Sequence, residues 1–165
     1  MGSYEFGKPE MVQWIKEHFK EGSTCLDVGA GDGKWCRLLG NYLTMDAVEV
    51  WPPNAFALEG YWEIFLRDIR KLEYDHYDLI IFGDVLEHMS IKEAQKVLAY
   101  ADQHSDDYIV SLPFNYKQGV QYGNPYEKHI QDDLNEENIK ERYPQLELLL
   151  KPTAYYAYYH RRQNG

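Results

Sequence analysis

A glycine-rich turn, Gly29-Ala30-Gly31-Asp32-Gly33, is the first part of the sequence whose residue types and spacing suit ligand chemistry. It follows a short apolar run and precedes a segment with apolar residues at helical spacing. Glycines let a ligand approach the backbone closely, and the start of a helix presents free N–H groups with positive partial charge. The turn therefore predicts a site for a polar or anionic part of a nucleotide-like ligand.

The spacing of these glycines argues against two common ligand classes. A dinucleotide-binding fold requires GxGxxG, and the third glycine would fall on Lys34. A phosphate loop requires a hydroxyl residue after its lysine, where this chain has Trp35. The carboxylate of Glu49, about 20 residues after the turn, has the chemistry to accept both hydrogen bonds of a ribose diol.

The run from Leu26 to Gly33 resembles the first motif of the class I S-adenosylmethionine (SAM)-dependent methyltransferases. The resemblance continues along the chain at Asp68-Ile69 and at Gly83-Asp84-Val85-Leu86-Glu87-His88. It implies a small member of the type-11 or type-23 kind, which binds SAM and releases S-adenosylhomocysteine. The cofactor-binding residues expected on this resemblance are Asp27, Gly29, Ala30, Gly31, Lys34, Glu49, Asp68, Ile69, Asp84 and Val85.

The elements that must position these residues alternate along the chain. Apolar periodicity predicts helices at 9–20, 34–42, 55–59, 91–104 and 135–143, and strands at 24–28, 45–51, 62–69, 77–85, 107–114, 145–151 and 153–159. Ile91 is expected on the buried face of the fourth helix. The pattern predicts an α/β fold with a mostly parallel sheet of about seven strands that ends in a close strand pair. Together with the resemblance it implies an open, mostly parallel seven-stranded Rossmann-like methyltransferase sheet, with helices on both faces and a C-terminal antiparallel strand pair. We expect one domain over 1–165.

His88 is the leading candidate for a catalytic residue. Methyl transfer from a sulfonium requires an in-line nucleophile, so orientation supplies much of the catalysis. An oxygen nucleophile of high pKa also needs a base, and His88 follows the fourth strand, where the sheet is expected to open onto the pocket. Glu87 and His129 complete the expected catalytic group. In the alternative interpretation, His88 is a structural residue at a helix start, satisfied by a neighbouring carboxylate.

A second interpretation makes the same group a metal site. Asp84, Glu87 and His88, together with His129, resemble the magnesium sites of ubiquinone-pathway O-methyltransferases and small-RNA 2′-O-methyltransferases. Asp84 replaces the usual Glu, and its shorter side chain weakens the match. Carboxylate–imidazole sets are also common without a metal, so we expect no metal and keep Mg²⁺ as the alternative.

The loop at 115–133 follows the fifth strand and is expected on the acceptor side. Ligands of open α/β sheets bind at the carboxyl ends of the strands. Tyr116, Tyr122 and Tyr126 have the chemistry to form an aromatic wall for a planar acceptor or to face the sulfonium charge. A solvated loop, in a chain that contains 15 tyrosines, is the alternative.

The amino-acid composition restricts the kinds of partner that we expect this chain to bind. The formal net charge of -10 disfavours nucleic acid, and we expect a small-molecule acceptor. The two cysteines lack metal-binding spacing and are expected to be free thiols, which indicates a reducing, cytoplasmic setting. No segment approaches the roughly 18 continuous apolar residues of a membrane span, so no membrane association is expected. The chain is short for its class, so the 9–20 helix and the loop, or a protein partner, would cover the acceptor.

The sequence thus predicts an enzyme that transfers the methyl group of SAM to an oxygen or nitrogen of a small molecule. A catalytically inactive SAM-binding partner or sensor module is the alternative. An NAD-type oxidoreductase is less favoured, because the glycines are spaced as GxGxG and the Leu-Glu-His run matches the methyltransferases.

Overall fold

The computed structural model describes residues 5–162, so residues 1–4 and 163–165 of the expected domain lie outside the described part. The strands are β1 (Thr24–Val28), β2 (Thr44–Glu49), β3 (Ile64–Leu66), β4 (Tyr77–Gly83), β5 (Ser105–Pro113), β6 (Leu146–Thr153) and β7 (Tyr156–Arg161). The α-helices are α1 (Lys8–His18), α2 (Lys34–Leu39), α3 (Pro52–Ala55), α4 (Ile91–His104) and α5 (Glu136–Arg142). Short 3₁₀ turns are η1 (Ile69–Lys71), η2 (Leu86–His88) and η3 (Pro125–Glu127).

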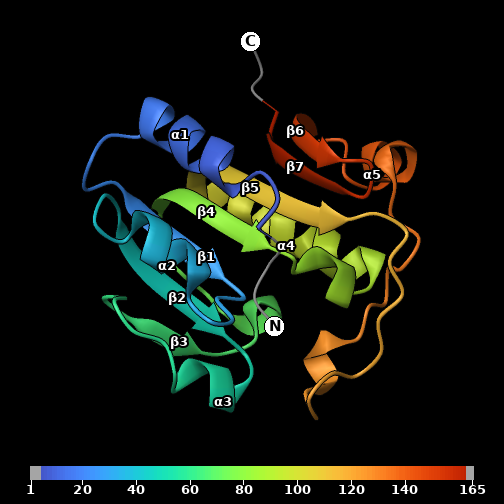
Figure 1. The fold of residues 1–165 in the computed structure, drawn as a ribbon, viewed down its shortest axis with the longest axis horizontal. Coiled ribbons are helices and arrows are strands. Elements are labelled where there is room, and N and C mark those ends of the chain that lie inside the picture. Colours follow the sequence, from blue (N-terminus) through green and yellow to red (C-terminus); the bar gives the residue numbers. More distant parts are fainter. Residues whose placement is uncertain (1–4, 163–165) are drawn as a thin grey trace.

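The strands form one sheet in the order β3-β2-β1-β4-β5-β7-β6 (Figure 1). The five strands from β3 to β5 are parallel, and β7 is antiparallel to both β5 and β6. This is the mostly parallel sheet with a closing antiparallel pair that the sequence predicts. The chain leaves β1 toward β2 and leaves β4 toward β5 on the other side, so the strand order reverses between β1 and β4. Such a switch point is where open α/β sheets bind ligands.

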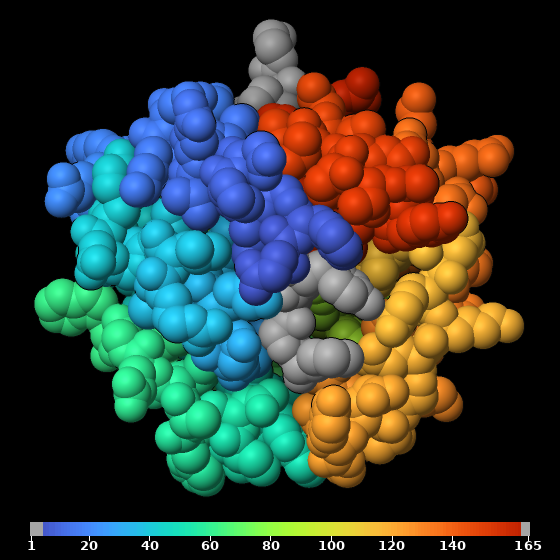
Figure 2. Space-filling view, viewed as in Figure 1, coloured from blue at the N-terminus to red at the C-terminus, as the bar shows by residue number. Residues whose placement is uncertain are grey.

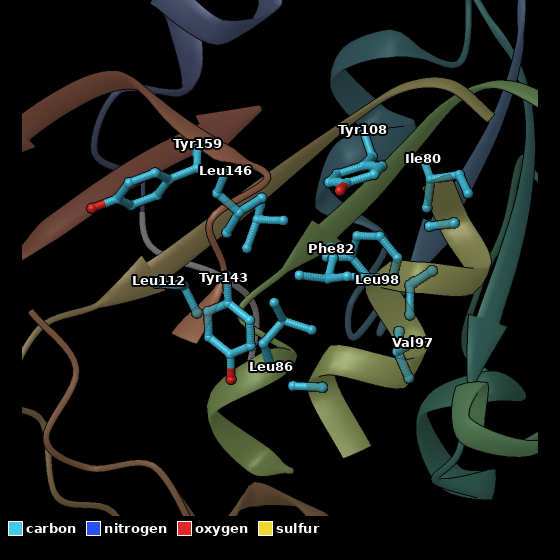
Figure 3. Close-up of a cluster of buried hydrophobic side chains, with 14 of the residues drawn as sticks. Ile80, Phe82, Leu86, Val97, Leu98, Tyr108, Leu112, Tyr143, Leu146 and Tyr159 are labelled. Carbon is cyan, nitrogen blue, oxygen red and sulfur yellow. The ribbon is translucent and has the colours of Figure 1, made fainter. Parts of the chain in front are cut away.

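Helices cover both faces of the sheet, and a hydrophobic core lies on each face. Alternate residues of the central strands point into one core or the other. Leu79 and Ile81 of β4 pack with the buried residues of α1 and α2. Ile80 and Phe82 face the other way and pack with α4 and α5 (Figures 1 and 3). Burial on both faces explains why β4 is continuously apolar. Within residues 5–162, no helix is long and apolar enough to cross a membrane.

Several element boundaries differ from those expected. The first helix is α1, Lys8–His18, rather than 9–20. The third helix begins at Pro52, because proline suits the first turn of a helix, and it ends where the expected 55–59 helix was to begin. The third strand is only Ile64–Leu66, an edge strand that pairs with β2. Ile91 is 38% exposed as the first residue of α4, so its expected burial is wrong.

Candidate functional site

A cavity opens at the carboxyl ends of the central strands, beside the switch point. Its lining combines the ends of β1, β2 and β4 with residues of η1, η2 and the loop at 115–133. In Figure 2 a hollow lies between the blue N-terminal segments and the orange loop, with green atoms from the middle of the chain at depth. The expected cofactor residues that line the cavity are Gly29, Gly31, Glu49, Asp68, Ile69, Asp84 and Val85.

The glycine-rich turn brings the end of β1 against its neighbours. Gly29 and Gly31 have φ values of 68° and 58°, which favour glycine. A Cβ at Gly29 would lie 2.7 Å from Cγ2 of Val85, so the turn has no room for a side chain there. The N–H of Gly31 donates to Oε2 of Glu49 at 2.9 Å. The turn and the end of β2 therefore form one wall of the cavity.

Glu49 is buried at the end of β2 and lines the cavity. Besides Gly31, the backbone N–H of Trp51 donates to its other oxygen, Oε1, at 3.0 Å. Burial raises the pKa of Glu49, and these backbone hydrogen bonds oppose the shift. They also fix the orientation of the carboxylate, whose remaining lone pairs can accept the two hydroxyl groups of a diol.

Asp68 and Ile69 lie where the chain enters η1, at the end of the cavity nearest β3. Arg70 donates to Asp68 from its backbone and its guanidinium, and it also pairs with Glu93 of α4. Partial burial acts to raise the pKa of Asp68, but the hydrogen bonds from Arg70 outweigh it and the pKa is lowered. The Asp68 carboxylate is thus held ionised, as a fixed acceptor beside an apolar side chain.

Asp27 lies outside the cavity lining. It is 1% exposed in β1, and its Oδ2 accepts a hydrogen bond from the Tyr61 hydroxyl at 2.6 Å. Its Oδ1 has no hydrogen-bond partner within residues 5–162. Burial raises the pKa of Asp27 to about 7, against the hydrogen bond from Tyr61, which lowers it.

Ala30 and Lys34 also lie outside the lining. Ala30 packs in a small apolar cluster with Ala47 and Leu58. The Nζ of Lys34 pairs with Oε1 of Glu5 at 2.7 Å. The structure therefore assigns the side chains of these two expected cofactor residues to packing and to an ion pair.

Asp84 lines the cavity with a left-handed backbone, φ 55°. Its Oδ1 accepts from the hydroxyl of Tyr156 at 2.7 Å and from the hydroxyl of Ser111 at 3.3 Å. Lys8 is buried, with its Nζ 4.5 Å from the centre of the Trp35 ring. Burial lowers the pKa of Lys8 to about 8, while the charge of Asp84 opposes that shift. Asp84 is therefore held between two strands and a buried cation.

Glu87, His88 and His129 come together at the other end of the cavity. Each offers one ligand atom, and these atoms all lie within 4.8 Å of one another. Nδ1 of His88 is 3.0 Å from the carbonyl oxygen of Lys128, and Nδ1 of His129 is 2.7 Å from that of Tyr116. Since a carbonyl only accepts, each Nδ1 carries the proton, and in the neutral ring each Nε2 keeps its lone pair.

The protonation of this cluster follows from its burial. Burial raises the pKa of Glu87 well above its usual range, and the nearby charge of Asp84 adds to the shift. Neither carboxylate oxygen of Glu87 has a hydrogen-bond partner among the described residues. Burial lowers the pKa of His88, so its imidazole is neutral at pH 7. The cluster thus combines a neutral base with a buried, unpartnered carboxyl group.

Only part of the alternative metal set is gathered here. Among residues 5–162, Asp84 is not in the group formed by Glu87, His88 and His129. Nε2 of His88 is 3.9 Å from Oε1 of Glu87, whereas two ligands of one tetrahedral metal at 2.0–2.1 Å lie about 3.3 Å apart. As placed, this one pair is farther apart than two ligands of such a tetrahedral ion.

The loop at 115–133 is fastened to the turn that carries the cluster. Nε2 of Gln131 donates to the carbonyl oxygens of Leu86 and Met89, at 3.0 and 3.1 Å. Of the three tyrosines expected at the acceptor, Tyr116 and Tyr126 line the cavity, whereas Tyr122 is 84% exposed and outside its lining.

Several residues that support the site carried no recognised motif. They are the residues that hold the expected ones: Tyr61, Ser111, Gln131 and Tyr156. One signal was available for Tyr156, because it alternates with Tyr158 on one face of a predicted strand and both are buried with α1 and α2. The others are brought in by tertiary packing from distant positions.

Comparison with known proteins finds solved structures with a similar fold. No protein-family model matches the sequence, and no curated protein matches it. A SAM-dependent methyltransferase from Clostridium acetobutylicum superposes with a TM-score of 0.73 at 15% identity, covering 94% of this chain and 89% of that one. A TehB-like SAM-dependent methyltransferase from Corynebacterium glutamicum gives a TM-score of 0.69 at 14% identity, covering 98% and 89%.

A third similar structure contains a product and an acceptor. It is the 1,6-didemethyltoxoflavin-N1-methyltransferase of Burkholderia thailandensis, with bound 1,6-didemethyltoxoflavin and S-adenosylhomocysteine. Its TM-score is 0.68 at 16% identity, and the match covers 96% of this chain and 78% of that one. The chain therefore has the fold of the class I SAM-dependent methyltransferases, with the sheet order and closing strand pair described above.

Proposed function

We propose that this chain is a SAM-dependent methyltransferase that acts on an oxygen or nitrogen of a small molecule, with residues 1–165 forming one catalytic domain. The observation that carries the proposal is the hydrogen bond between Gly31 and Glu49 in the wall of the cavity. It places an oriented, buried carboxylate beside a glycine-rich turn, at the switch point where this fold binds nucleotides. The similar structures that contain SAM or S-adenosylhomocysteine support the same ligand.

The described residues fit the cofactor. Gly29 leaves backbone exposed where a Cβ would meet Val85, Glu49 can accept the ribose diol, and Asp68 with Ile69 offers a fixed acceptor and an apolar surface for adenine. When bound, SAM supplies an electrophilic methyl group on a sulfonium. We assign Asp84 and Val85 to the same part of the cavity. Asp27 lies outside the lining and supports the turn that forms the cofactor site. Ala30 and Lys34 are assigned no side-chain contact with the cofactor.

The cluster at the other end is proposed to hold the acceptor. His88, neutral and with its Nε2 lone pair available, takes the proton of the nucleophile. His129 and Glu87 orient the acceptor beside it, and Tyr116 and Tyr126 supply aromatic surface. The loop at 115–133 keeps the acceptor out of water, which strengthens these contacts.

A SAM-binding module without catalysis is the alternative function. The buried, unpartnered carboxyl of Glu87 favours the enzyme, because such a group costs stability and is expected where a ligand compensates it. We also propose a cytoplasmic setting, which the two free cysteines support.

Thermal unfolding tests the cofactor. We expect SAM and S-adenosylhomocysteine each to raise the melting temperature and NAD to leave it unchanged. A rise with NAD alone would overturn the proposal. Labelled SAM with a panel of small acceptors then separates the enzyme from the binding module, since only the enzyme transfers label.

A further inference from the structure

We propose that the acceptor is an amine, bound as its ammonium ion by Glu87 together with the free ring nitrogens of His88 and His129. This inference rests on the proposed function and names the chemical class of its acceptor. It starts from the part of the cavity lined by Asp84, Glu87 and Glu127.

Acidic groups dominate this part of the cavity. From Gly83 to His129, the described lining residues include Asp84, Glu87 and Glu127 and no lysine or arginine. The two lining arginines, Arg67 and Arg70, lie next to Asp68, and Arg70 is paired with Asp68 and with Glu93. A carboxylate or phosphate acceptor would therefore meet acidic side chains of like charge in this part of the cavity, at a cost that low dielectric increases.

Glu87 is the group that requires a cation. It is 1% exposed, and both of its carboxylate oxygens are unpartnered among the described residues. Its backbone cannot move away, because its carbonyl oxygen accepts hydrogen bonds from the N–H groups of Ile130 and Gln131. A buried carboxylate is stable only when it is protonated or paired, and an ammonium ligand both pairs it and satisfies its lone pairs.

The spacing of the cluster leaves room for an ammonium ion. Three acceptors around one tetrahedral nitrogen, at ordinary hydrogen-bond lengths near 2.9 Å, lie about 4.7 Å apart. The ligand atoms of Glu87, His88 and His129 lie within 4.8 Å of one another, and the Glu87–His88 separation is 3.9 Å. In the neutral rings both Nδ1 atoms donate to backbone carbonyls and both Nε2 atoms are acceptors, which suits a ligand that only donates.

The same placement allows the reaction. The ammonium transfers one proton to Nε2 of His88, which frees the lone pair of the nitrogen. That lone pair forms the new N–C bond to the methyl carbon while the C–S bond breaks and its electron pair stays on sulfur. The positive charge of the sulfonium ends on the methylated ammonium, which Glu87 is placed to stabilise. The proton on His88 is then released to solvent.

The test uses methylammonium, the smallest ligand with this chemistry, on the full chain saturated with S-adenosylhomocysteine. Methylammonium, acetate and methanol are titrated separately while the ¹⁵N signals of the histidine rings are followed by NMR. We expect methylammonium to shift the signals of His88 and His129 with an affinity at least tenfold higher than that of acetate or methanol. Glu87→Gln should lower that affinity at least tenfold, and Glu137→Gln, a control at an exposed carboxylate of α5, should leave it unchanged.

The outcomes separate the amine from its alternatives. Equal or stronger shifts with acetate or methanol, no shift with methylammonium, or full binding by Glu87→Gln would each overturn the amine assignment. So would Mg²⁺ or Zn²⁺ that perturbs the same two histidines and blocks methylammonium, since the cluster would then be a metal site. Saturation by S-adenosylhomocysteine is measured first. A failure to bind the cofactor, which would count against the proposed function, is thereby distinguished from a failure to bind the amine.

Discussion

The side-chain amide of Gln131 donates to the carbonyl oxygen of Leu86 at 3.0 Å, across 45 positions of the sequence. Gln131 is buried, and its Oε1 accepts from the hydroxyl of Tyr143 at 2.8 Å. One side chain thus links the acceptor loop, the turn before Glu87 and the segment after α5. Gln131 touches neither cofactor nor acceptor in our assignment, so we regard it as a positioning residue.

Gln131→Leu should lower turnover at least tenfold while SAM affinity changes less than twofold. Leucine cannot donate to the carbonyls of Leu86 and Met89. The carbonyl of Leu86 keeps the backbone N–H of Met89 as a donor, whereas the carbonyl of Met89 loses the bond from Gln131, and an unsatisfied buried group costs about 1–3 kcal/mol. Turnover and calorimetric SAM affinity are measured together with the melting temperature. Gln13→Leu on the exposed side of α1 is the control. A parallel loss of SAM binding and turnover would show that the role of Gln131 is general stability.

Glu49→Ala should weaken SAM binding at least tenfold, since it removes the acceptor for the ribose hydroxyls and leaves the N–H groups of Gly31 and Trp51 without their partner. Glu49→Gln keeps the shape but lacks one acceptor oxygen, so we expect an intermediate loss. Isothermal calorimetry measures both, with Glu59→Ala at an exposed position as the control. Unchanged affinity in Glu49→Ala would remove this residue from the cofactor site.

His88→Ala should lower turnover more than SAM affinity, because its proposed role is in proton transfer. Burial lowers the pKa of His88, so the active neutral form persists to a pH below the ordinary histidine value of about 6.5. A pH–rate profile of the wild type should therefore lose activity only below that value. An acid limb at or above it, or wild-type turnover in His88→Ala, would return His88 to a structural role.

The stability of the ligand-free protein should fall as the pH rises from 5 to 8. Burial raises the pKa of Asp27 to about 7 from its ordinary value near 3.8, so the folded state binds more protons than the unfolded state in this range. The stability that protonated Asp27 contributes is fully present below the pKa that Asp27 has in the unfolded state. It is lost as the pH rises through the pKa that Asp27 has in the folded state. Glu49 and Glu87, whose pKa values are also raised, act in the same direction.

Asp27→Asn tests the contribution of Asp27, since asparagine keeps an oxygen to accept from Tyr61 but does not ionise. Its melting temperature should depend less on pH than that of the wild type between pH 5 and 8. Asp132→Asn, on the acceptor loop, serves as the control. Identical pH dependence in Asp27→Asn and the wild type would contradict the raised pKa.

Removal of divalent metal should leave turnover within twofold of its initial value. The described structure gathers only three residues of the alternative metal set, at the open spacing given above. Turnover is measured after chelation and again after Mg²⁺ is added back. Loss on chelation with recovery on Mg²⁺ would favour the metal interpretation of the cluster.

Local patterns in the sequence determined the class of fold and were enough to propose one half of the candidate site. Alternating apolar segments fix which faces of the strands and helices are buried, because burial of those faces stabilises the sheet. The GxGxG turn and Glu49 could be proposed because they lie at fixed points of a strand-turn-helix unit, and Asp68 because Asp68-Ile69 resembles the methyltransferases. Their chemistry is local: a glycine-rich backbone and carboxylates at strand ends.

Only the tertiary structure decided how the other half is assembled. It placed Ala30 and Lys34 outside the lining, left Asp84 out of the group formed by Glu87, His88 and His129, and brought His129 to His88 across a loop. Tyr156, Ser111 and Gln131 act through hydrogen bonds between segments far apart in the chain, whose geometry depends on how β7 and the loop pack. Burial itself is a property of the whole fold. The raised pKa of Glu87 and the lowered pKa of His88 therefore follow from packing, and no spacing of residue types encodes them.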